Sequence, residues 1–465
     1  MSGSFATIST ALTALQTSRV ALDVAAGNVA NANTDGYVRR RVETESVGAP
    51  ARPAMWSRVE AAGSGVRVAG LTRMSDAFLD TRARQEHGVQ SYLDVRHEVL
   101  SRMETALGEP GDNGVTAELS GFRQAWHDLA NNPTGGAARS QVLARAESVA
   151  RAFAGQARSV ATEASGQRSR AQSIVAEANT LATGLASMNE AIASADLTGA
   201  DASDLLDRRD VMAMRLAELT GAKVTIGTRG TAEAALNGVA LVAGNAAGRL
   251  EIAGGIAADG SADGAPVSFS VATPGGPGAT NPGPLGGELG ATAELLNTTM
   301  PGYLANLSQA ARTLADTVNA QHVLGFDLTG TPGAAMFSYD PGNVAGTLAL
   351  ALSDPDQVAA SALPGGVLDV SNAQLLGATN PAQGDYQRLV SAMGTEVLLA
   401  GRLSAGQRAV TNQVDGSREQ LSGVSLDEET VTLLAHQRAY EAAARVLTTV
   451  DSMLDTLINR TGITR

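Results

Sequence analysis

The sequence has few of the residues from which active sites and nucleic-acid-binding surfaces are usually built. None of its 465 residues is cysteine, 3% are aromatic, and Lys223 is the single lysine among 34 basic residues. A chain without cysteine forms no disulfide and carries no thiol chemistry. The formal net charge is -13. Beyond Arg39–Arg41 the sequence offers no basic stripe for nucleic acid, and we expect that triplet to be a solvated surface.

The chain also lacks segments that would place it in a membrane. No apolar run approaches the length of about 18 residues that a membrane-spanning helix needs. No basic residue precedes Arg19, so the start of the sequence does not match a secretory signal peptide. The sequence therefore predicts a protein without a membrane span. If the protein leaves a cell, we expect it to do so without a cleaved signal.

Alanine and glycine are abundant instead, and the 51 glycines separate long stretches of helical periodicity. Apolar residues at three- and four-residue steps predict a helix from about residue 4 to about 31; they are Phe5, Ile8, Leu12, Leu15 and Leu22. The stretch 27–37, GNVANANTDGY, should end this helix. Asparagine tolerates the left-handed conformation, and Asp35-Gly36 favours a turn.

Further helices are expected through the middle of the chain. After residues 38–74, which look irregular or strand-like, Ser75 is expected to cap a helix that ends near residue 107. The remaining helical segments are expected in 115–220, with breaks at 131–136 and 196–201, and in 288–323 and 383–421.

The last helix, expected over 425–459, has the clearest pattern in the sequence. Ser425 and Glu428 have the spacing of a capping box, in which two side chains bind backbone N–H groups at a helix start. A large apolar residue then recurs every seventh position, at Leu426, Leu433, Tyr440, Leu447 and Leu454, with Val450 and Leu457 at companion positions. This heptad repeat is typical of a coiled-coil seam.

These elements predict a mainly α-helical protein with β-rich insertions, of the α+β multidomain class. Short alternating runs and the hairpin signal Asn237-Gly238 predict the insertions. We expect a terminal coiled-coil domain of 1–40 plus 422–465, a helical bundle of 41–221 plus 284–325 plus 373–421, and outer β-rich insertions at 222–283 and 326–372. Three domains also agree with a prior of roughly 150 residues per domain.

The long amphipathic helices at the two ends of the chain are expected to pair with each other. A helix pair alone buries little apolar surface and is marginally stable. We therefore expect both ends to be largely disordered in the free chain and to become ordered when neighbouring copies cover them. The loops around 34–44 and 415–424 are candidate hinges, because they contain Gly36, Gly416 and Gly423.

The stretch 25–40, AAGNVANANTDGYVRR, resembles the N-terminal signature of the axial proteins of the bacterial flagellum. The matching residues are Asn28, Val29, Ala30, Asn31, Asn33, Thr34, Gly36 and Tyr37. Three further stretches, 204–226, 286–330 and 422–462, resemble the hook-associated junction proteins of that family. They follow one another in order across nearly the whole chain, and they favour this branch of the family over the hook and rod proteins.

The resemblance implies a structural protein, not an enzyme, that forms the first junction layer between hook and filament and allows the filament to assemble. It implies a ring of subunits in a helical lattice and type III export to the flagellum outside the cell. The partners it implies are other copies of the chain, the hook protein, the second junction protein and a cytosolic export chaperone. We expect no cofactor, no metal, no nucleic acid and no membrane partner.

The candidate assembly interface lies on the two terminal helices and the signature between them. On the N-terminal side it comprises Ile8, Leu12, Leu15, Leu22, Asn28, Asn31, Asn33, Thr34, Gly36 and Tyr37. On the C-terminal side, where the chaperone is also expected to bind, it comprises Leu426, Leu433, Tyr440, Leu447, Val450, Leu454 and Leu457.

Motifs for catalysis or metal binding are incomplete. The segment 97–101 begins like a zinc-protease motif but has Ser101 in place of the second histidine. The segment 259–264 begins like a calcium-binding loop but has Ser270 at the glutamate position, so we expect a tight hairpin turn there. Two alternatives remain open. One is another axial protein, from the hook or distal rod; the other is a secreted enzyme or adhesin displayed on the filament.

Overall fold

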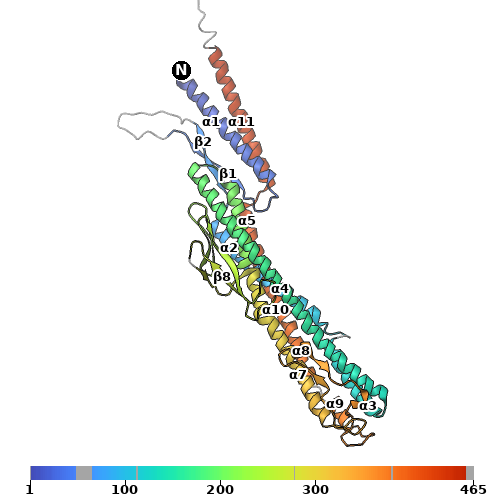
Figure 1. The fold of residues 1–465 in the computed structure, drawn as a ribbon. Helices are drawn as coiled ribbons and strands as arrows, with labels where there is room; N and C mark the ends of the chain where they lie inside the picture. The colour runs from blue at the N-terminus through green and yellow to red at the C-terminus, as the bar shows by residue number, and fades with distance from the viewer. Residues whose placement is uncertain (1, 49–64, 112–113, 277, 379–380, 457–465) are drawn as a thin grey trace, which may run out of the picture.

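The molecule is a long rod made mostly of helices (Figure 1). The computed structural model describes residues 2–48, 65–111, 114–276, 278–378 and 381–456. The terminal helices α1 (Ser2–Ala30) and α11 (Leu426–Asp455) lie side by side at one end, and α3 (Val115–Asn131) and α9 (Ser371–Ala378) lie at the other. The start of α1 and the end of α11 therefore share one end of the rod.

One helix runs along most of the bundle. The helix α4 (Gly136–Thr198) has 63 residues, which corresponds to about 95 Å at 1.5 Å per residue. It ends at Gly199, which has a φ of 69° and supplies the left-handed residue that commonly ends a helix. It packs against α3, α5 (Ser203–Thr220) and α7 (Met300–Val323). The predicted breaks at 131–136 and 196–201 are confirmed, because they separate these helices.

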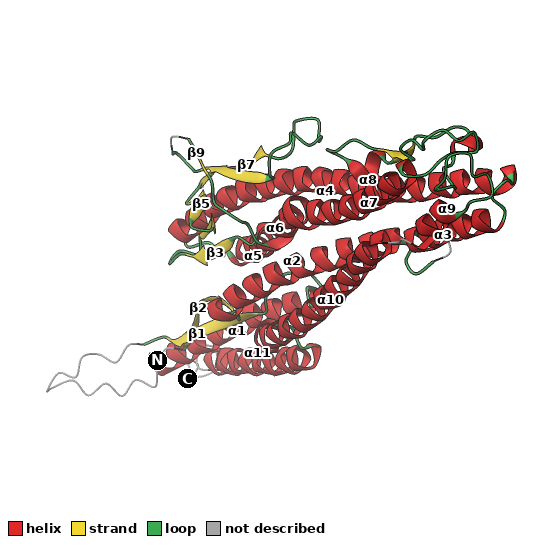
Figure 2. Cartoon of the chain, turned by 90° about the horizontal axis from the view of Figure 1, so that it is seen from below, coloured by secondary structure: helices red, strands yellow, loops and turns green. Residues whose placement is uncertain are grey.

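The other long helices complete the bundle. The helices α2 (Ala77–Leu107) and α10 (Pro381–Ser422) pack along each other (Figure 2). The short α6 (Gly287–Glu294) continues through a π-helical turn, Leu295–Thr299, into α7. The cap of α2 is not Ser75 as predicted but Asp76, whose carboxylate accepts hydrogen bonds from the N–H groups of Phe78 and Leu79.

The core of the bundle is built around a few aromatic side chains and many small ones. Trp126, Phe153 and Tyr386 are fully buried in the half of the rod that contains α3. The side-chain amide of Gln156 connects helices within this core. It donates to the Tyr386 hydroxyl at 2.5 Å and accepts from the Tyr303 hydroxyl at 3.2 Å. A second core lies where the sheets cover α4 and α5. Buried alanines let these helices pack closely despite the scarcity of aromatic residues.

The predicted β-structure in 222–283 is confirmed. A four-stranded antiparallel sheet contains β3 (Lys223–Ile226), β4 (Ala232–Leu236), β5 (Val239–Ala243) and β6 (Ala246–Ala247), and a three-stranded sheet contains β7 (Arg249–Gly254), β8 (Ser268–Ala272) and β9 (Ala279–Thr280). Both lie against the rod on the side away from α10 (Figure 2). Asn237 and Gly238 have φ of 46° and 89°, as the two-residue hairpin between β4 and β5 requires.

The prediction of a β-rich insertion at 326–372 was wrong in extent. Its strands are β10 (Phe337–Ser338) and β11 (Ala349–Leu350), two residues each, and its short helices are α8 (Val344–Thr347) and a 3-10 turn at Pro355–Gln357. Side chains that bind nearby backbone N–H groups organise the rest, as Asp327, Asn343 and Asp369 do. Such local bonds compete with strand pairing, and the alternation in this segment produces a sheet of just two short strands, β10 and β11.

A hairpin connects the terminal helices to the bundle. Within the segment 38–74, predicted to be irregular or strand-like, β1 (Arg40–Ser46) pairs antiparallel with β2 (Val66–Arg73). Both strands pack against α1. The side-chain hydroxyl of Thr17 donates to the carbonyl of Val66 at 3.4 Å, which fixes β2 beside the helix.

Two histidines are expected to give the free energy of unfolding opposite pH dependences. His322 is buried: its Nδ1 lies 2.6 Å from the Ala334 carbonyl, and its Nε2 accepts from the N–H of Ala359 at 2.9 Å. Burial lowers the pKa of His322. The native state then binds fewer protons than the unfolded chain below pH about 6.5, so stability falls as the pH drops from there towards the lowered pKa.

His87 behaves in the opposite sense, because its hydrogen bond to Glu218 and its proximity to Asp415 raise its pKa. The stabilising contribution of His87 to the free energy of unfolding is present below pH about 6.5 and is lost as the pH rises through the raised pKa. Denaturant unfolding between pH 5 and 8 tests both expectations. His322→Asn should remove the loss of stability at acidic pH. His87→Asn should remove the loss of stability at basic pH. Unchanged slopes in either variant would contradict the assignment for that residue.

Candidate assembly interface

The buried side chains of the two terminal helices are mostly small. The antiparallel helices α1 and α11 pack along each other, but the buried positions of α1 are Ala11, Ser18, Ala21, Ala25 and Asn28. On α11 the buried residues are Glu429 and Ala443. A contact between alanines removes little apolar area from water, and each Å² contributes only about 25 cal/mol. The pair is therefore well fitted but weakly held by its own apolar surface.

The large apolar residues predicted as the interface are only partly covered. Leu12 is 48% exposed, and Ile8, Leu15 and Leu22 are half-buried. On α11, Leu426 and Tyr440 are exposed, while Leu433, Leu447, Val450 and Leu454 are half-buried; Leu457 lies outside the described residues. The structure brings these residues onto one helix pair and leaves Leu12, Leu426 and Tyr440 the most exposed of them. Their role in assembly stays a prediction.

Sequence analysis missed a second apolar row on α11. Val431, Leu434, Val446 and Met453 lie off the heptad, and Val431 and Met453 are 66% and 60% exposed. At 100° per residue, Val431, Val446 and Met453 fall on one side of the helix, and Leu434 lies at its edge. The signal was present in the sequence, but the regular heptad beside it masked it.

Asn28 is the centre of a joint between the terminal helices and the rest of the chain. Its side chain is 1% exposed. Its amide nitrogen donates to the Arg40 carbonyl at 2.9 Å and to Glu429 at 3.1 Å, and its oxygen accepts from the Tyr37 hydroxyl at 2.8 Å and from the Arg40 N–H at 3.0 Å. One residue thus ties α1, β1 and α11 together.

The remaining signature residues support the turn after α1. The carbonyl of Asn31 accepts from the Thr34 N–H at 2.9 Å, and the carbonyl of Thr34 accepts from the Tyr37 N–H at 3.1 Å. Gly36 has a φ of 76°, and a side chain there would lie 2.2 Å from the Val211 side chain. Asn33 is exposed. The signature therefore builds a compact turn that rests on α5.

The expectation that Arg39–Arg41 is a solvated surface was wrong for two of the three residues. Arg39 forms ion pairs with Glu428 at 2.8 Å and with Glu429 at 2.7 Å. Arg40 pairs with Asp207 at 3.0 Å and also with Asp204. Arg41 is exposed. Partners on distant helices cover these arginines, and nothing within the triplet itself indicates them.

The acidic partners of this joint lie on α5. Asp207 accepts from Arg73 at 2.7 Å, and Asp210 accepts from Arg73 at 2.8 Å and from Arg209 at 2.6 Å. Side chains from β1, β2 and α5 therefore form one charged network that continues to α11 through Arg39. In the sequence, the segment 204–210 belongs to a stretch that resembles the family. Nothing in that stretch indicated that its carboxylates form ion pairs.

The joint fixes orientation more than it adds stability. Removing charges from water costs about as much as their attraction returns, so a half-buried network of this kind mainly selects one geometry. Burial raises the pKa of Tyr37, which keeps its hydroxyl protonated as a donor to Asn28. Of the two predicted hinge loops, 34–44 is held by this network. The second loop, predicted at 415–424, is shorter than expected, because α10 continues to Ser422 and α11 begins at Leu426.

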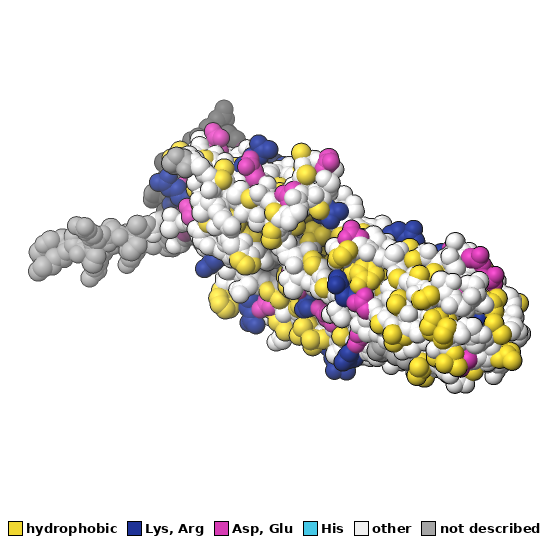
Figure 3. Space-filling view, turned by 60° about the horizontal axis from the view of Figure 1, so that its bottom comes forward, with side chains coloured by type: hydrophobic (Ala, Val, Ile, Leu, Met, Phe, Trp, Pro, Cys, Tyr) yellow, Lys and Arg dark blue, Asp and Glu magenta, His cyan; other side chains and the backbone are white. Residues whose placement is uncertain are grey.

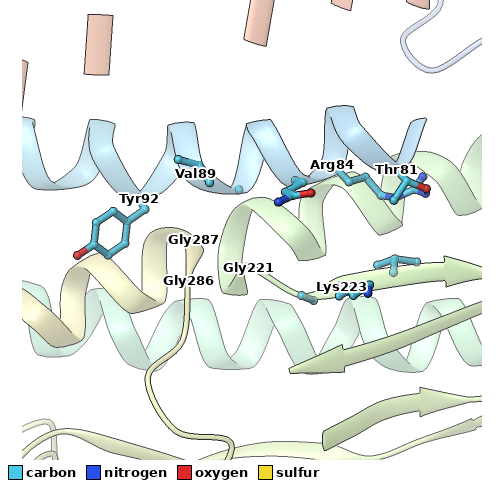
Figure 4. A pocket seen from close by; sticks show the side chains of 12 residues that line it. Thr81, Arg84, Val89, Tyr92, Gly221, Lys223, Gly286 and Gly287 are labelled. Atoms are coloured by element: carbon cyan, nitrogen blue, oxygen red, sulfur yellow. The ribbon is translucent and has the colours of Figure 1, made fainter. Parts of the chain in front are cut away.

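A cavity lies beside α2 in the bundle. It measures about 390 Å³ and lies between α2, the end of α5 and the start of α6 (Figure 4). Gly221, Gly286 and Gly287 let the backbones approach closely, since a Cβ on Gly221 would lie 2.6 Å from the Gly286 Cα. Arg84 lines the cavity and burial lowers its pKa. The lining includes no carboxylate and no imidazole, the groups that usually act as acid or base.

The incomplete motifs fold as ordinary structure. The segment 97–101 lies inside α2. The predicted hairpin turn at 259–264 is confirmed: it lies between β7 and β8, where Asp259 binds the N–H of Ser261 and Asp263 that of Ala265. Within the described residues, no helix combines the length and the apolar character needed to cross a membrane.

The paired terminal helices, the signature turn and the helical bundle define a flagellar axial protein. Models of the flagella basal body rod protein and of the C-terminal region of flagellar basal body rod FlgEFG proteins match residues 8–37 and 419–460. A third model, the helical domain of the flagellar hook-associated protein FlgK, matches residues 100–337, just over half of the chain. The chain belongs to this FlgK family of flagellar hook-associated proteins.

Individual relatives agree. Flagellar hook-associated protein 1 of Bacillus subtilis is 29% identical over 513 residues, which covers 100% of this chain and 99% of that protein. The protein of the same name from Escherichia coli is 25% identical, and the match covers 97% of this chain and 99% of that protein. The one from Salmonella typhimurium is 29% identical, and the match covers 71% of this chain and 59% of that protein. The flagellar hook junction protein FlgK of Burkholderia pseudomallei shares the fold, with a TM-score of 0.63, 16% identity, and coverage of 74% of this chain and 100% of that one.

Substituting Asn28 should destabilise the joint, whereas substituting the neighbouring Asn33 should not. Asn28→Ala leaves buried partners on Arg40, Tyr37 and Glu429 without their bonds, and each unsatisfied group costs about 1–3 kcal/mol. Because the joint forms together with the terminal pair, we expect Asn28→Ala to weaken the chain after its incorporation on isolated hooks, where the denaturant needed to release it should fall by the equivalent of about 2 kcal/mol or more. The control Asn33→Ala should stay within about 0.5 kcal/mol of the unsubstituted chain. Equal effects of the two substitutions would show that the buried network is unimportant.

Proposed function

We propose that this chain forms the first junction layer between the flagellar hook and filament, on which the filament then assembles. As a member of the hook-associated family it is a structural protein of the bacterial flagellum. The finer assignment is a ring of subunits that is one layer of a tubular helical lattice. Such contacts between copies are heterologous, so the layer can continue into the layers below and above it.

The observation that carries this proposal is the incompletely covered apolar surface of the terminal pair. The heptad residues of α11 are half-buried or exposed, and the row at Val431, Val446 and Met453 faces outward. Each large apolar side chain that a neighbour covers contributes about 1.5–3 kcal/mol. Neighbouring α1–α11 pairs offer the same kind of surface, so copies arranged in a ring can bury one another's rows and form the wall of a tube.

The joint gives this arrangement its geometry. Asn28, Arg39 and Arg40 connect the terminal pair to β1 and α5 through directional bonds. The terminal pair can then line the inside of the tube while the bundle stands at a set angle outside it. In this proposal the division of the chain follows the predicted domains: 1–40 plus 422–465 for the wall, 41–221 plus 284–325 plus 373–421 for the bundle, and 222–283 and 326–372 for the outer insertions.

The proposed partners are other copies of the chain, the hook protein below, the second junction protein above, and a cytosolic export chaperone. The chaperone is proposed to cover the C-terminal helix before export, because its apolar rows would otherwise face water. Export without a cleaved signal peptide, through the growing flagellum, is part of the same proposal. Neither nucleic acid nor membrane is proposed as a partner.

The nearest alternative is another axial protein of the hook or distal rod. The rod-protein models match only the terminal segments, whereas the helical domain between them matches the hook-associated family, which favours the junction. A secreted enzyme or adhesin would need a site in the sheets of 222–283. Glycan binding or hydrolysis by the purified full chain would favour that alternative.

Deleting the gene and restoring it with variants tests the junction function. We expect cells without the chain to carry finished hooks without filaments and to release flagellin into the medium. The double variant Val431→Ser with Met453→Ser should restore at least tenfold fewer filaments than the unsubstituted chain, since two lost contacts of about 1.5 kcal/mol or more each exceed a tenfold change. The control Leu197→Ser removes a leucine at the end of α4 that is 79% exposed and should restore filaments fully. Normal filaments on the deletion strain would refute the proposal.

A further inference from the structure

One buried arginine of the bundle has no counter-charge. Arg84 on α2 is 4% exposed. Among the described residues, its guanidinium donates one hydrogen bond, from Nη2 to the Thr81 hydroxyl at 3.1 Å, and its Nε has no acceptor. A guanidinium has five N–H donors, so most of the donors of Arg84 are free. Burying a charge without a partner costs free energy, and packing alone therefore does not account for this residue.

The carboxylates around Arg84 are bound to other cations. Asp80 accepts from Arg418 at 2.8 Å, and Asp210 accepts from Arg73 at 2.8 Å. The other carboxylates of α5 and α6, and that of the next acidic residue of α2, form ion pairs with other arginines in the same way; they are Glu86, Asp204, Asp207, Glu218, Glu288 and Glu294. These elements therefore supply no free anion to Arg84.

The cavity beside α2 combines Arg84 with two further positive groups (Figure 4). Lys223 on β3 is exposed and lines the cavity from the side opposite to α2. The helix α6 begins at the cavity with Gly286 and Gly287, and no side chain caps its first N–H groups, which carry the partial positive charge of a helix start. Glu233, diagonal to Lys223 on β4, is exposed and is not part of the lining. Acidic and basic side chains are interspersed over the surface in Figure 3, whereas the charges that line this cavity are positive.

The remaining walls of the cavity are largely apolar. Val89 and Tyr92 of α2 and Val224 of β3 belong to the lining. The volume of about 390 Å³ lies in the range of roughly 300–1,000 Å³ that is usual for small-molecule sites. A molecule that fits these walls has an anionic group at one end and an apolar body. A carboxylate suits Arg84 best, because its two oxygens accept from two N–H groups of one guanidinium.

We propose that this cavity binds a small organic anion, a carboxylate with an aromatic or aliphatic body, between Arg84 and Lys223. The bound carboxylate supplies the counter-charge that Arg84 lacks, and its apolar body lies against Val89 and Tyr92. It thereby joins α2, β3 and the start of α6, and it stabilises the bundle by mass action. The inference goes beyond the proposed junction function and does not depend on it, because all the walls of the cavity belong to one chain.

Lys223 reports occupancy of the cavity directly, because it is the single lysine of the chain. The free full-length chain is treated with an amine-acylating reagent, and mass spectrometry follows the peptide that contains Lys223. The probes are phenylacetate and naphthoate, each compared with its neutral amide and with inorganic phosphate. A carboxylate at about ten times its Kd should slow the acylation about tenfold, because only the unoccupied chain reacts. It should also raise the midpoint of thermal unfolding, and the amides should change neither quantity.

A matched pair of variants tests the role of Arg84. Arg84→Gln removes the charge and keeps a donor for Thr81, whereas Arg151→Gln removes an arginine of α4 whose side chain is 67% exposed. In calorimetric titration with the same carboxylates, Arg84→Gln should bind at least about tenfold more weakly, and Arg151→Gln should match the unsubstituted chain. Without ligand, Arg84→Gln should unfold at the same temperature or higher, because it no longer buries an unpaired charge. An arginine with a purely structural role would give a lower temperature.

Each outcome supports or overturns the site. Protection of Lys223 by the carboxylates alone, lost in Arg84→Gln, supports it. If no carboxylate protects Lys223, or if Arg84→Gln binds them normally, the proposal is wrong. If inorganic phosphate protects as well as the carboxylates, the apolar walls take no part and the assigned class of ligand is overturned. If protection appears only after the chain is incorporated on hooks, the occupant is a side chain of another subunit, which also overturns the proposal. Filament restoration by Arg84→Gln in the deletion strain reports the junction function separately.

Discussion

The contact between α1 and α11 is the constraint on which the rest of the molecule depends. The buried positions of α1, which packs against α11 and the strands β1 and β2, are alanine, serine and asparagine, so the helix packs closely while its larger apolar side chains are only partly covered. Those side chains, among them Leu12 and Val431, remain available to other helices. A pair of this kind is complete only within a larger array, because its own apolar burial is small. Assembly therefore follows from which residues occupy the contact.

The charged joint turns this pair into part of a rigid rod. Asn28 and Arg39 bind Glu429 at the start of α11, while Arg40 and Arg73 bind Asp207 on α5. Each bond is directional, and together they set the angle between the terminal pair and the bundle. The long α4 then carries that orientation to the far end of the molecule. A subunit that must meet different neighbours at its two ends benefits from this defined geometry.

The sequence predicted the helices well where the helical periodicity of apolar residues is strong. It predicted contacts poorly where the two partner residues lie far apart in the chain. The ends of α3, α4 and α5 and the Asn237-Gly238 hairpin follow from local signals that act within a few residues. The pairing of Arg40 with Asp207 joins residues far apart in the chain, and no local pattern encodes it. The small buried residues Ala11, Ser18 and Ala25 recur every seventh position of α1. The sequence analysis instead predicted that the larger leucines form the interface. In 326–372, polar side chains that bind the backbone outweighed the alternation of apolar residues.

Amide hydrogen exchange of α1 and α11 tests the central claim most directly. The free chain in dilute solution is compared with the same chain incorporated on isolated hooks, and peptides from 2–30 and 426–455 are followed by mass spectrometry. We predict rapid exchange of both helices in the free chain, slow exchange of α4, and strong protection of all three after incorporation. Full protection of α1 and α11 in the free chain would contradict the account, because the terminal pair would then be complete without neighbours.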